Sequence, residues 1–465
     1  MLSFLMSELG SLACAIRALN LVILWLVFWP MALIGAEPTL LALHGFQAVE
    51  VRQQGFELPR PMKVHVFARG GAVRTAWHRT NETPFFAYGW ILNADTREVV
   101  WQMDGANTKR DWDYRIADQY LDLPQGRYEA YFSNHGFGQN LLFAQWTRNI
   151  DRRDLDTRRQ HAQGFLAAIG EDDASLLHHW REEVGNYGLE IYLPAGNPAE
   201  VKRFEAPLAW KNRMIRLDAN TDSGHWSQAF HLKHPVAIHV YAEGEGGSRH
   251  MDDYGWILDA HSRKRLWEMT LGESAFAGGA RKNRREVETL TLPAGDYEAH
   301  FITDDSHSPA DWNDAPPCDP GLYGLTLSVP KDSDLASFST VEPLSWPVLA
   351  EVVRVGNDQD RRATLTLKAE QQVRVLAIGE ADDDEIADDA WIEDAAGKRI
   401  WSLDPLRSLH AGGATKNRMA DEIITLPKGS YTLRVRTDDS HAYGDWNSAP
   451  PWDAEHYGIT VFAVK

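Results

Sequence analysis

The sequence predicts an all-β protein of three tandem antiparallel β-sandwich domains of jelly-roll-like type, with a helical insertion in the first domain and a signal peptide before it. Three observations predict this fold class. The same motif blocks recur three times in one order, short segments with alternating apolar residues recur within each copy, and proline-glycine turns separate these segments.

Residues 1–36 are typical of an export signal. Arg17 precedes an unbroken apolar run at 21–29, which Pro30 follows, and small residues end the segment at Ala36. We expect cleavage after Ala36, and an uncleaved N-terminal anchor is the alternative. The mature chain is then extracytoplasmic, either periplasmic or secreted, and spans no membrane.

Five motif blocks carry the repeat, and the second and third copies keep all five. In the second copy they are DYGWILD (253–259), AGGARKNR (277–284), LPAGDYEAHFITDDSH (292–307), DWNDAPPCD (311–319) and YGLTLSV (323–329). In the third they are DAWIED (389–394), AGGATKNR (411–418), LPKGSYTLRVRTDDSH (426–441), DWNSAPPWD (445–453) and YGITVFAV (457–464). Chance agreement of five ordered blocks is negligible, so the copies share one ancestor.

The first copy keeps the frame but has diverged. It retains YGWILNADTREVVW (88–101), TKR (108–110), LPQGRYEAYFSNHG (123–136) and YGLEIYLP (187–194). The acidic pair of the other copies is aligned here with Ser133 and Asn134. About fifty residues, 137–186, separate the last two blocks, and their apolar spacing predicts a helical insertion. It either covers a sandwich edge or docks a partner.

These blocks place the domains at 37–195, 204–330 and 347–465. Each contains alternating strands, such as VAIHVYA (236–242) and YTLRVRT (431–437). The blocks LPQG, LPAG and LPKG mark turns. Because the linkers are short, we expect fixed contacts between domains.

Composition excludes several classes of function. The chain has 66 acidic and 47 basic residues and a net charge of -19, which argues against nucleic acid as a partner. Of the two cysteines, Cys14 lies in the export signal, so Cys318 alone remains after cleavage. An internal disulfide and a thiolate zinc site are therefore excluded.

The order of the strand with a G-W-hydrophobic-x-D segment, the LPxGxY turn and the terminal YGxT strand resembles the bacterial pre-peptidase C-terminal domain. The resemblance is one of pattern and could cover each copy. It implies a jelly-roll-like sandwich appended to secreted proteins, with substrate-adhesion or calcium-dependent roles. The DWNxAPP loop has no counterpart in that family's pattern.

The loop before the last strand of the second and third copies is rich in the oxygen ligands that calcium requires. The candidate metal ligands are Asp304, Asp305, Asp311, Asn313 and Asp319 in the second copy, and Asp438, Asp439, Asp445, Asn447 and Asp453 in the third. Two readings need no metal. The polar residues can cap turns, or the KNR segments at 282–284 and 416–418 can pair with the acidic residues.

The same loops contain candidate ligand-binding residues. Trp312 and Trp446 either stack on a sugar or anchor the loop, and His307 and His441 are expected to form loop hydrogen bonds. Asp305, Ser306 and His307 do not form a catalytic triad, because adjacent residues of an extended chain point to opposite faces. The remaining repeated tryptophans, Trp90, Trp256, Trp391, Trp101, Trp267 and Trp401, are expected to pack in the cores.

We therefore expect a non-enzymatic exported binding or assembly protein, whose acidic DDSH and DWN loops in the second and third copies meet a protein or polysaccharide at the cell surface or in the periplasm, with calcium ordering the loops. The alternatives are a polysaccharide-binding enzyme or enzyme-accessory protein, and a structural spacer.

Overall fold

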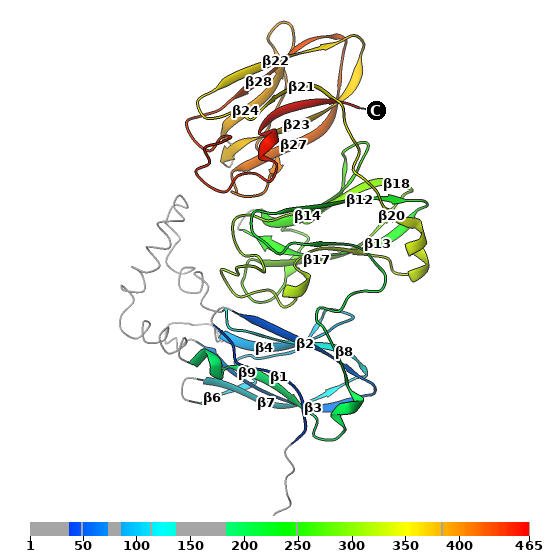
Figure 1. Ribbon diagram of the computed structural model, residues 1–465, viewed down its shortest axis with the longest axis vertical. Coiled ribbons are helices and arrows are strands. Elements are labelled where there is room, and N and C mark those ends of the chain that lie inside the picture. The colour runs from blue at the N-terminus through cyan, green and yellow to red at the C-terminus, as the bar shows by residue number, and fades with distance from the viewer. Residues whose placement is uncertain are drawn as a thin grey trace, which may run out of the picture.

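The computed structural model describes residues 37–47, 50–72, 85–111, 114–135, 183–247, 250–382 and 385–464. Within these ranges the three copies form three antiparallel two-sheet domains stacked along one axis (Figure 1). The predicted signal peptide, and nearly all of the predicted helical insertion, lie outside the described residues. No helix in the described ranges is long and apolar enough to cross a membrane.

Each domain has two sheets that share a crossing strand. In the first domain one sheet contains β1 (Thr39–Leu43), β9 (Gly188–Tyr192), β3 (Met62–Ala72), β7 (Tyr114–Leu123) and β6 (Thr108–Asp111). The other contains β10 (Lys202–Phe204), β2 (Val51–Leu58), β8 (Gly126–Ser133), β4 (Phe85–Asn93) and β5 (Val99–Gln102). The start of β4 pairs with the end of β3, which joins the sheets at one corner.

The second and third domains repeat this topology. The second has β11 (Arg213–Asp218), β19 (Gly324–Ser328), β13 (Val236–Gly246), β17 (Asn283–Leu292) and β16 (Ala275–Phe276) in one sheet, and β20 (Phe338–Thr340), β12 (His225–Leu232), β18 (Gly295–Ile302), β14 (Met251–Asp259) and β15 (Arg265–Glu268) in the other. The third has β21 (Val348–Val353), β29 (Gly458–Ala463), β23 (Gln371–Asp382), β27 (Asn417–Leu426) and β26 (Leu409–His410), opposite β22 (Asp360–Leu367), β28 (Gly429–Arg436), β24 (Glu385–Glu393) and β25 (Arg399–Ser402). The short 3₁₀ turns are η1 (Val184–Asn186), η2 (Pro198–Glu200), η3 (Pro320–Leu322), η4 (Asp332–Ser337) and η5 (Ala454–His456).

The repeated sequence motifs correspond to repeated contacts. Alternate residues of β13 and β28 are buried between the sheets, as their sequence pattern predicts. In each LPxGxY turn the tyrosine hydroxyl donates to the carbonyl of the turn proline: Tyr128 to Pro124 at 3.0 Å, Tyr297 to Pro293 at 2.9 Å and Tyr431 to Pro427 at 2.7 Å. The motif thus closes the same strand connection three times.

Two domain boundaries differ from the sequence prediction. The predicted bounds end the first domain at 195 and begin the second at 204, but β10 pairs with β2 and extends the first domain to Phe204. Likewise β20 pairs with β12 and extends the second domain to Thr340. In both cases the connecting segment adds an edge strand, because that strand end offers unpaired backbone groups.

The junction between the first two domains is fixed by a buried charge network. Arg97 lies in the turn between β4 and β5, and its guanidinium donates to Glu129 at 2.8 and 2.9 Å and to Asp319 of the second domain. The side chains of Arg97, Glu129 and Asp319 are at most 2% exposed. Next to them the Trp90 indole donates to the carbonyl of Cys318 at 2.7 Å. These contacts join the domains rigidly.

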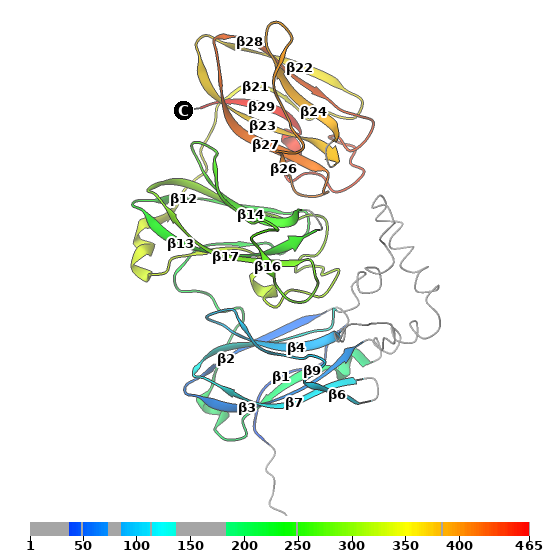
Figure 2. The ribbon, with the colours of Figure 1, turned by 180° about the vertical axis from the view of Figure 1, so that it is seen from behind.

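The second junction uses the equivalent turn. Arg263 lies at the position of Arg97 and pairs with Glu298 at 2.8 Å and with Asp421 of the third domain at 2.7 Å. The ring of His225 stacks on Trp452, with centroids 3.9 Å apart. The upper sheet of one domain therefore faces the lower sheet of the next at both junctions, as Figures 1 and 2 show.

In the third domain, the sheet of β22, β28, β24 and β25 lacks the turn arginine that the equivalent sheets of the first two domains use at their junctions. Gly397 occupies the turn position of Arg97 and Arg263, and all three residues have a positive φ, at 80°, 61° and 58°. Trp391 is covered by the guanidinium groups of Arg399 and Arg434, at 3.8 and 5.2 Å from its ring.

This arrangement corrects the expectation that Trp90 and Trp391 pack inside the sandwiches. Trp90 is buried against the second domain, and Trp391 is covered by arginines. Trp101, Trp256 and Trp267 belong to the main apolar clusters, as predicted, and the cluster that holds Trp256 and Trp267 also includes residues of the third domain.

Candidate functional site

The KNR, DDSH and DWN segments meet at one end of the second domain. Nζ of Lys282 lies 2.9 Å from Oε1 of Glu245 and donates to Oδ1 of Asn313 at 2.6 Å. The imidazole of His307 bridges the side-chain oxygens of Asn283, at 2.6 Å, and Asn313, at 2.9 Å. The three motifs therefore recur together because they form one hydrogen-bonded unit.

Three carboxylates gather beside this unit. Glu245 at the end of β13, Asp253 near the start of β14 and Asp304 just after β18 each place an oxygen within 4.8 Å of the others. All three are at most 7% exposed. Asp253 accepts from the Tyr323 hydroxyl and from the backbone N–H of Asp304, both at 2.6 Å. We call this set the second-domain carboxylate cluster.

The third domain contains the same cluster at equivalent positions, Glu380, Asp388 and Asp438. Tyr457 donates to Asp388 at 2.5 Å, and Lys416 lies 2.8 Å from Glu380. We call this set the third-domain carboxylate cluster. Glu380 and Asp388 are buried, at 7% and 1% exposed, whereas Asp438 is not.

Burial makes the ionised form of these carboxylates unfavourable. It raises the pKa of Glu245 to about 7, against the opposing effect of Lys282. Burial, followed by the charge of Glu245, raises the pKa of Asp253 well above its usual value, and burial together with Asp253 does the same for the pKa of Asp304. Burial also raises the pKa of Asp388 to about 7. A bound cation would reverse these shifts.

The first domain has no such cluster at the equivalent described positions. The strand registers align Glu245, Asp253 and Asp304 with Gly71, Ala87 and His135. A Cβ at Gly71 would lie 2.2 Å from the ring of Phe86, so an aromatic ring fills the space that Glu245 occupies in the second domain. The structure also corrects the alignment of the acidic pair with Ser133 and Asn134, because His135 matches Asp304.

Of the ten predicted metal ligands, Asp304 and Asp438 belong to the clusters. The other eight are Asp305, Asp311, Asn313, Asp319, Asp439, Asp445, Asn447 and Asp453. Asn313 and Asn447 instead accept from Lys282 and Lys416. Asp319 binds Arg97 across the first junction, and Asp453 pairs with His456 at 2.9 Å.

The remaining candidate ligands are also accounted for. Asp311 is exposed and its backbone closes a turn with Ser308. Asp445 accepts from Asn357 at 3.0 Å. Asp305 and Asp439 follow the cluster members but lie outside both clusters. The pairing of the KNR segments with acids is found, but the lysine partners are Glu245 and Glu380 rather than the DD pair.

The predicted ligand-binding residues are mainly structural. Trp312 is 5% exposed and packs edge-on against Tyr323, with ring centroids 5.1 Å apart. His307 and His441 are fully buried, and His441 bonds to Asn417 at 2.7 Å. Trp446 is partly buried and packs against Tyr457 in the same way. The loops are therefore anchored by their aromatic residues, and of the two tryptophans Trp446 is the one that stays partly exposed.

We expect the pKa of His441 and the pKa of His65 to be shifted in opposite directions. Burial, with Lys416 nearby, lowers the pKa of His441 to about 4. The carboxylates of Asp118 and Glu37 raise the pKa of His65, although burial opposes them. Protonation of His441 in the unfolded chain near pH 6.5 means that its contribution to stability is complete above that pH and is lost as the pH falls toward 4. NMR titration of the imidazole rings checks this, and a His441 midpoint near 6.5 would contradict it.

Sequence reasoning missed Glu245, Asp253, Glu380 and Asp388. Each lies on a strand rather than in the acidic loop, and strand carboxylates are usually solvent-facing. One signal was available, since Glu245 and Glu380, and likewise Asp253 and Asp388, occupy identical positions in two copies.

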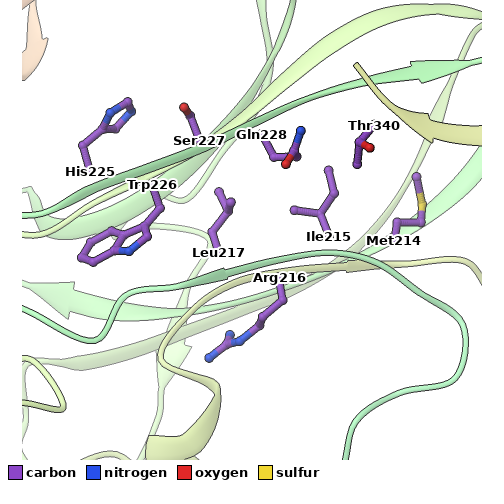
Figure 3. Close-up of a pocket in the computed structure, with 9 residues that line it drawn as sticks. All are labelled: Met214, Ile215, Arg216, Leu217, His225, Trp226, Ser227, Gln228 and Thr340. Atoms are coloured by element: carbon purple, nitrogen blue, oxygen red, sulfur yellow. The ribbon is translucent and has the colours of Figure 1, made fainter. Parts of the chain in front are cut away.

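Two hollows, one in the second domain and one between the second and third domains, are alternative candidate sites. One of about 540 Å³ lies between β11 and β12, with Ile215, Leu217 and Trp226 on its walls (Figure 3). Its one cationic lining residue, Arg216, points away and donates to backbone carbonyls of Gly321 and Leu322. This hollow therefore offers a ligand little charge.

The other hollow, of about 850 Å³, lies between the second and third domains. Protein groups already stack on three of the four tryptophans that line it. His225 covers Trp452, and Arg265 and Arg374 cover Trp256 and Trp346, with guanidinium carbons 4.5 and 5.4 Å from the rings. The carboxylate clusters are therefore the better candidate site.

Comparisons with known proteins give no family. No family model and no curated protein matches the chain. A structure with the CBM32 and catalytic domains of ZmpB from Clostridium perfringens is 9% identical, with a TM-score of 0.15, and covers 90% of this chain and 53% of that one. Procruciferin, an 11S globulin from Brassica napus, is 10% identical, with a TM-score of 0.12, and covers 64% of this chain and 86% of that one. This chain thus spans about half of the first protein's length. Likenesses this weak support no inference about function.

Proposed function

We propose that this protein is a non-catalytic, exported binding or assembly protein, in which calcium orders the acidic loops of the second and third domains. The observation that carries the proposal is the recurrence of one three-carboxylate cluster in two domains, with all three acids buried in the second domain and two of the three in the third. Three buried acids with a single lysine beside them retain an excess of two negative charges when ionised, and a divalent cation balances that excess.

The donor set favours calcium among the common divalent ions. All donors are oxygens, which suits calcium and magnesium rather than zinc or copper. Magnesium usually keeps several of its waters, whereas calcium accepts 6 to 8 oxygens, including bidentate carboxylates. The buried Glu245, Asp253 and Asp304 leave little room for a hydrated ion. This fit supports calcium.

The recognition surface belongs to the third domain. The second-domain loop is largely buried, with Asp304 bridged to Gly413 of the third domain and Asp311 as its exposed acid. The equivalent third-domain loop is more open and has exposed side chains at both Asp439 and Asp445. We propose that this loop meets a protein or polysaccharide at the cell surface or in the periplasm.

Calcium binding is expected at two sites, each removed by one isosteric substitution. Asp253→Asn and Asp388→Asn keep the acceptor for the tyrosine hydroxyl but remove a charged ligand. Each variant should bind one calcium fewer in calorimetry. At calcium 100-fold above Kd, the wild type should gain about 2.7 kcal/mol of stability per site.

Asp394→Asn serves as the control, because Asp394 is a turn residue outside both clusters that accepts bonds from Ala396 and Lys398 backbone N–H groups. It should bind as the wild type does. A melting curve that chelator leaves unchanged, together with no calorimetric signal, would overturn the proposal.

A further inference from the structure

The second-domain carboxylate cluster lies directly at the junction with the third domain. The backbone N–H of Gly413 donates to the carbonyl of Thr303 at 3.3 Å, and Asp304 forms a parallel bridge with Gly413. Gly413 has a φ of 68°, and a Cβ there would lie 2.0 Å from the Pro450 carbonyl oxygen. The glycine is therefore required by packing within the third domain, and the contact across the junction is made by its backbone with that of Thr303 and Asp304, just after β18.

Asp304 takes part both in the contact with the third domain and in the second-domain carboxylate cluster. Its main chain contacts the third domain, while its carboxylate belongs to the cluster and accepts from the N–H of Ser306 at 3.0 Å. Its own N–H donates to Asp253 at 2.6 Å. A cation that fixes these carboxylates therefore also fixes Thr303 and Asp304, which contact the third domain.

One carboxylate oxygen in the cluster lacks a protein partner. Oε1 of Glu245 is paired with Lys282, but Oε2 has no hydrogen-bond partner among the described residues, although the side chain is only 9% exposed. A buried acceptor without a donor is unfavourable, because it has given up its hydrogen bonds to water. This oxygen lies beside two further carboxylates, where a cation would satisfy it.

The first junction provides an internal comparison. At the position of Asp304 the first domain has His135, which is buried and whose pKa burial lowers to about 4. Both junctions have a buried turn arginine, Arg97 between Glu129 and Asp319 at the first and Arg263 between Glu298 and Asp421 at the second. What the second junction has in addition is the carboxylate cluster, so calcium is expected to act on the second junction and not on the first.

We propose that a divalent cation bound by Glu245, Asp253 and Asp304 locks the second domain against the third, so that the second junction, which Arg263 already bridges, is more rigid with calcium than without it. This inference rests on the calcium binding proposed above. The first junction stays rigid in both states, and the third-domain cluster acts on no junction within the chain.

The test uses the full mature chain in a Cys318→Ala background with pairs of spin labels. Exposed Lys233 and Lys368, changed to cysteine, report on the second junction, and exposed Lys63 with Lys233 reports on the first. If only the docked state binds calcium, 100-fold excess over Kd raises the ratio of docked to undocked molecules about 100-fold. The Lys233–Lys368 distance distribution should narrow with calcium, and the Lys63–Lys233 distribution should not change.

Two variants separate the possible outcomes. Asp253→Asn, or Glu245→Gln if that variant fails to fold, should abolish the effect of calcium on the second junction, whereas Asp388→Asn should preserve it. Terbium luminescence, sensitised by Tyr323 and Trp312, reports binding independently. Terbium binding without narrowing would overturn the locking inference alone, and absence of binding would overturn the proposed calcium site with it.

Discussion

Replacing Arg97 with methionine is expected to destabilise the first two domains by about 3–5 kcal/mol, because two buried carboxylates then lack their counter-charge. Glu129 and Asp319 are fully buried, and each has only neutral donors besides Arg97, such as the hydroxyls of Tyr131 and Tyr241 at 2.6 and 2.7 Å. Neutral hydrogen bonds do not replace a bidentate guanidinium at both carboxylates.

Urea denaturation measures this loss, and alkylation of Cys318 locates it. Burial raises the pKa of the Cys318 thiol to about 12, so the thiol should react slowly while the junction is closed and faster in the Arg97 variant. Arg127→Met is the matched control, because its partner Asp95 is 43% exposed and such surface pairs contribute about 0–1 kcal/mol. Equal stabilities of the two variants would show that the buried network does not hold the junction.

Trp312→Ala is expected to cost the second domain about 3–5 kcal/mol, as for other buried tryptophans. The indole fills the space between His307 and Tyr323, with ring centroids 4.8 and 5.1 Å away, and Tyr323 in turn holds Asp253. The cavity would therefore loosen the cluster as well as the core, and we expect weaker calcium binding at that site.

Phe276→Ala is the control for Trp312→Ala, since Phe276 is 55% exposed and its loss should change the free energy of unfolding by about 0.5 kcal/mol or less. Urea denaturation compares the two. A loss of less than about 1 kcal/mol in the free energy of unfolding for Trp312→Ala would mean that the fold does not need the indole. The alternative role from the sequence, stacking on a sugar, would then be favoured again.

The repeat made the architecture predictable, because alternation and turn motifs depend on local sequence. Alternation also showed that Val236 and Tyr431 face the interior. It could not show which neighbour buries Trp90, since Cys318 is 228 residues away and the contact exists only after two domains stack. The same holds for Asp319, which pairs with Arg97 across 222 residues. Its motif suggested a metal ligand, and its true partner lies in another copy.

Only two of the six cluster carboxylates could be singled out from the sequence. Asp304 and Asp438 stood out because the acidic loop is conspicuous in the repeat. Glu245 and Asp253 are brought together only because β14 begins beside the end of β13 before it crosses to the other sheet. A strand that pairs in both sheets has no local sequence signal, so these carboxylates could be placed only by the structure.

The glycine at position 397 leaves the third domain without the turn arginine that both junctions use. A head-to-tail interface that can be made once can in principle be made indefinitely, and copies joined in this way grow into open filaments. In the third domain Arg399 and Arg434 lie over the tryptophan that a following copy would cover. This face therefore lacks the contacts that would continue the stack.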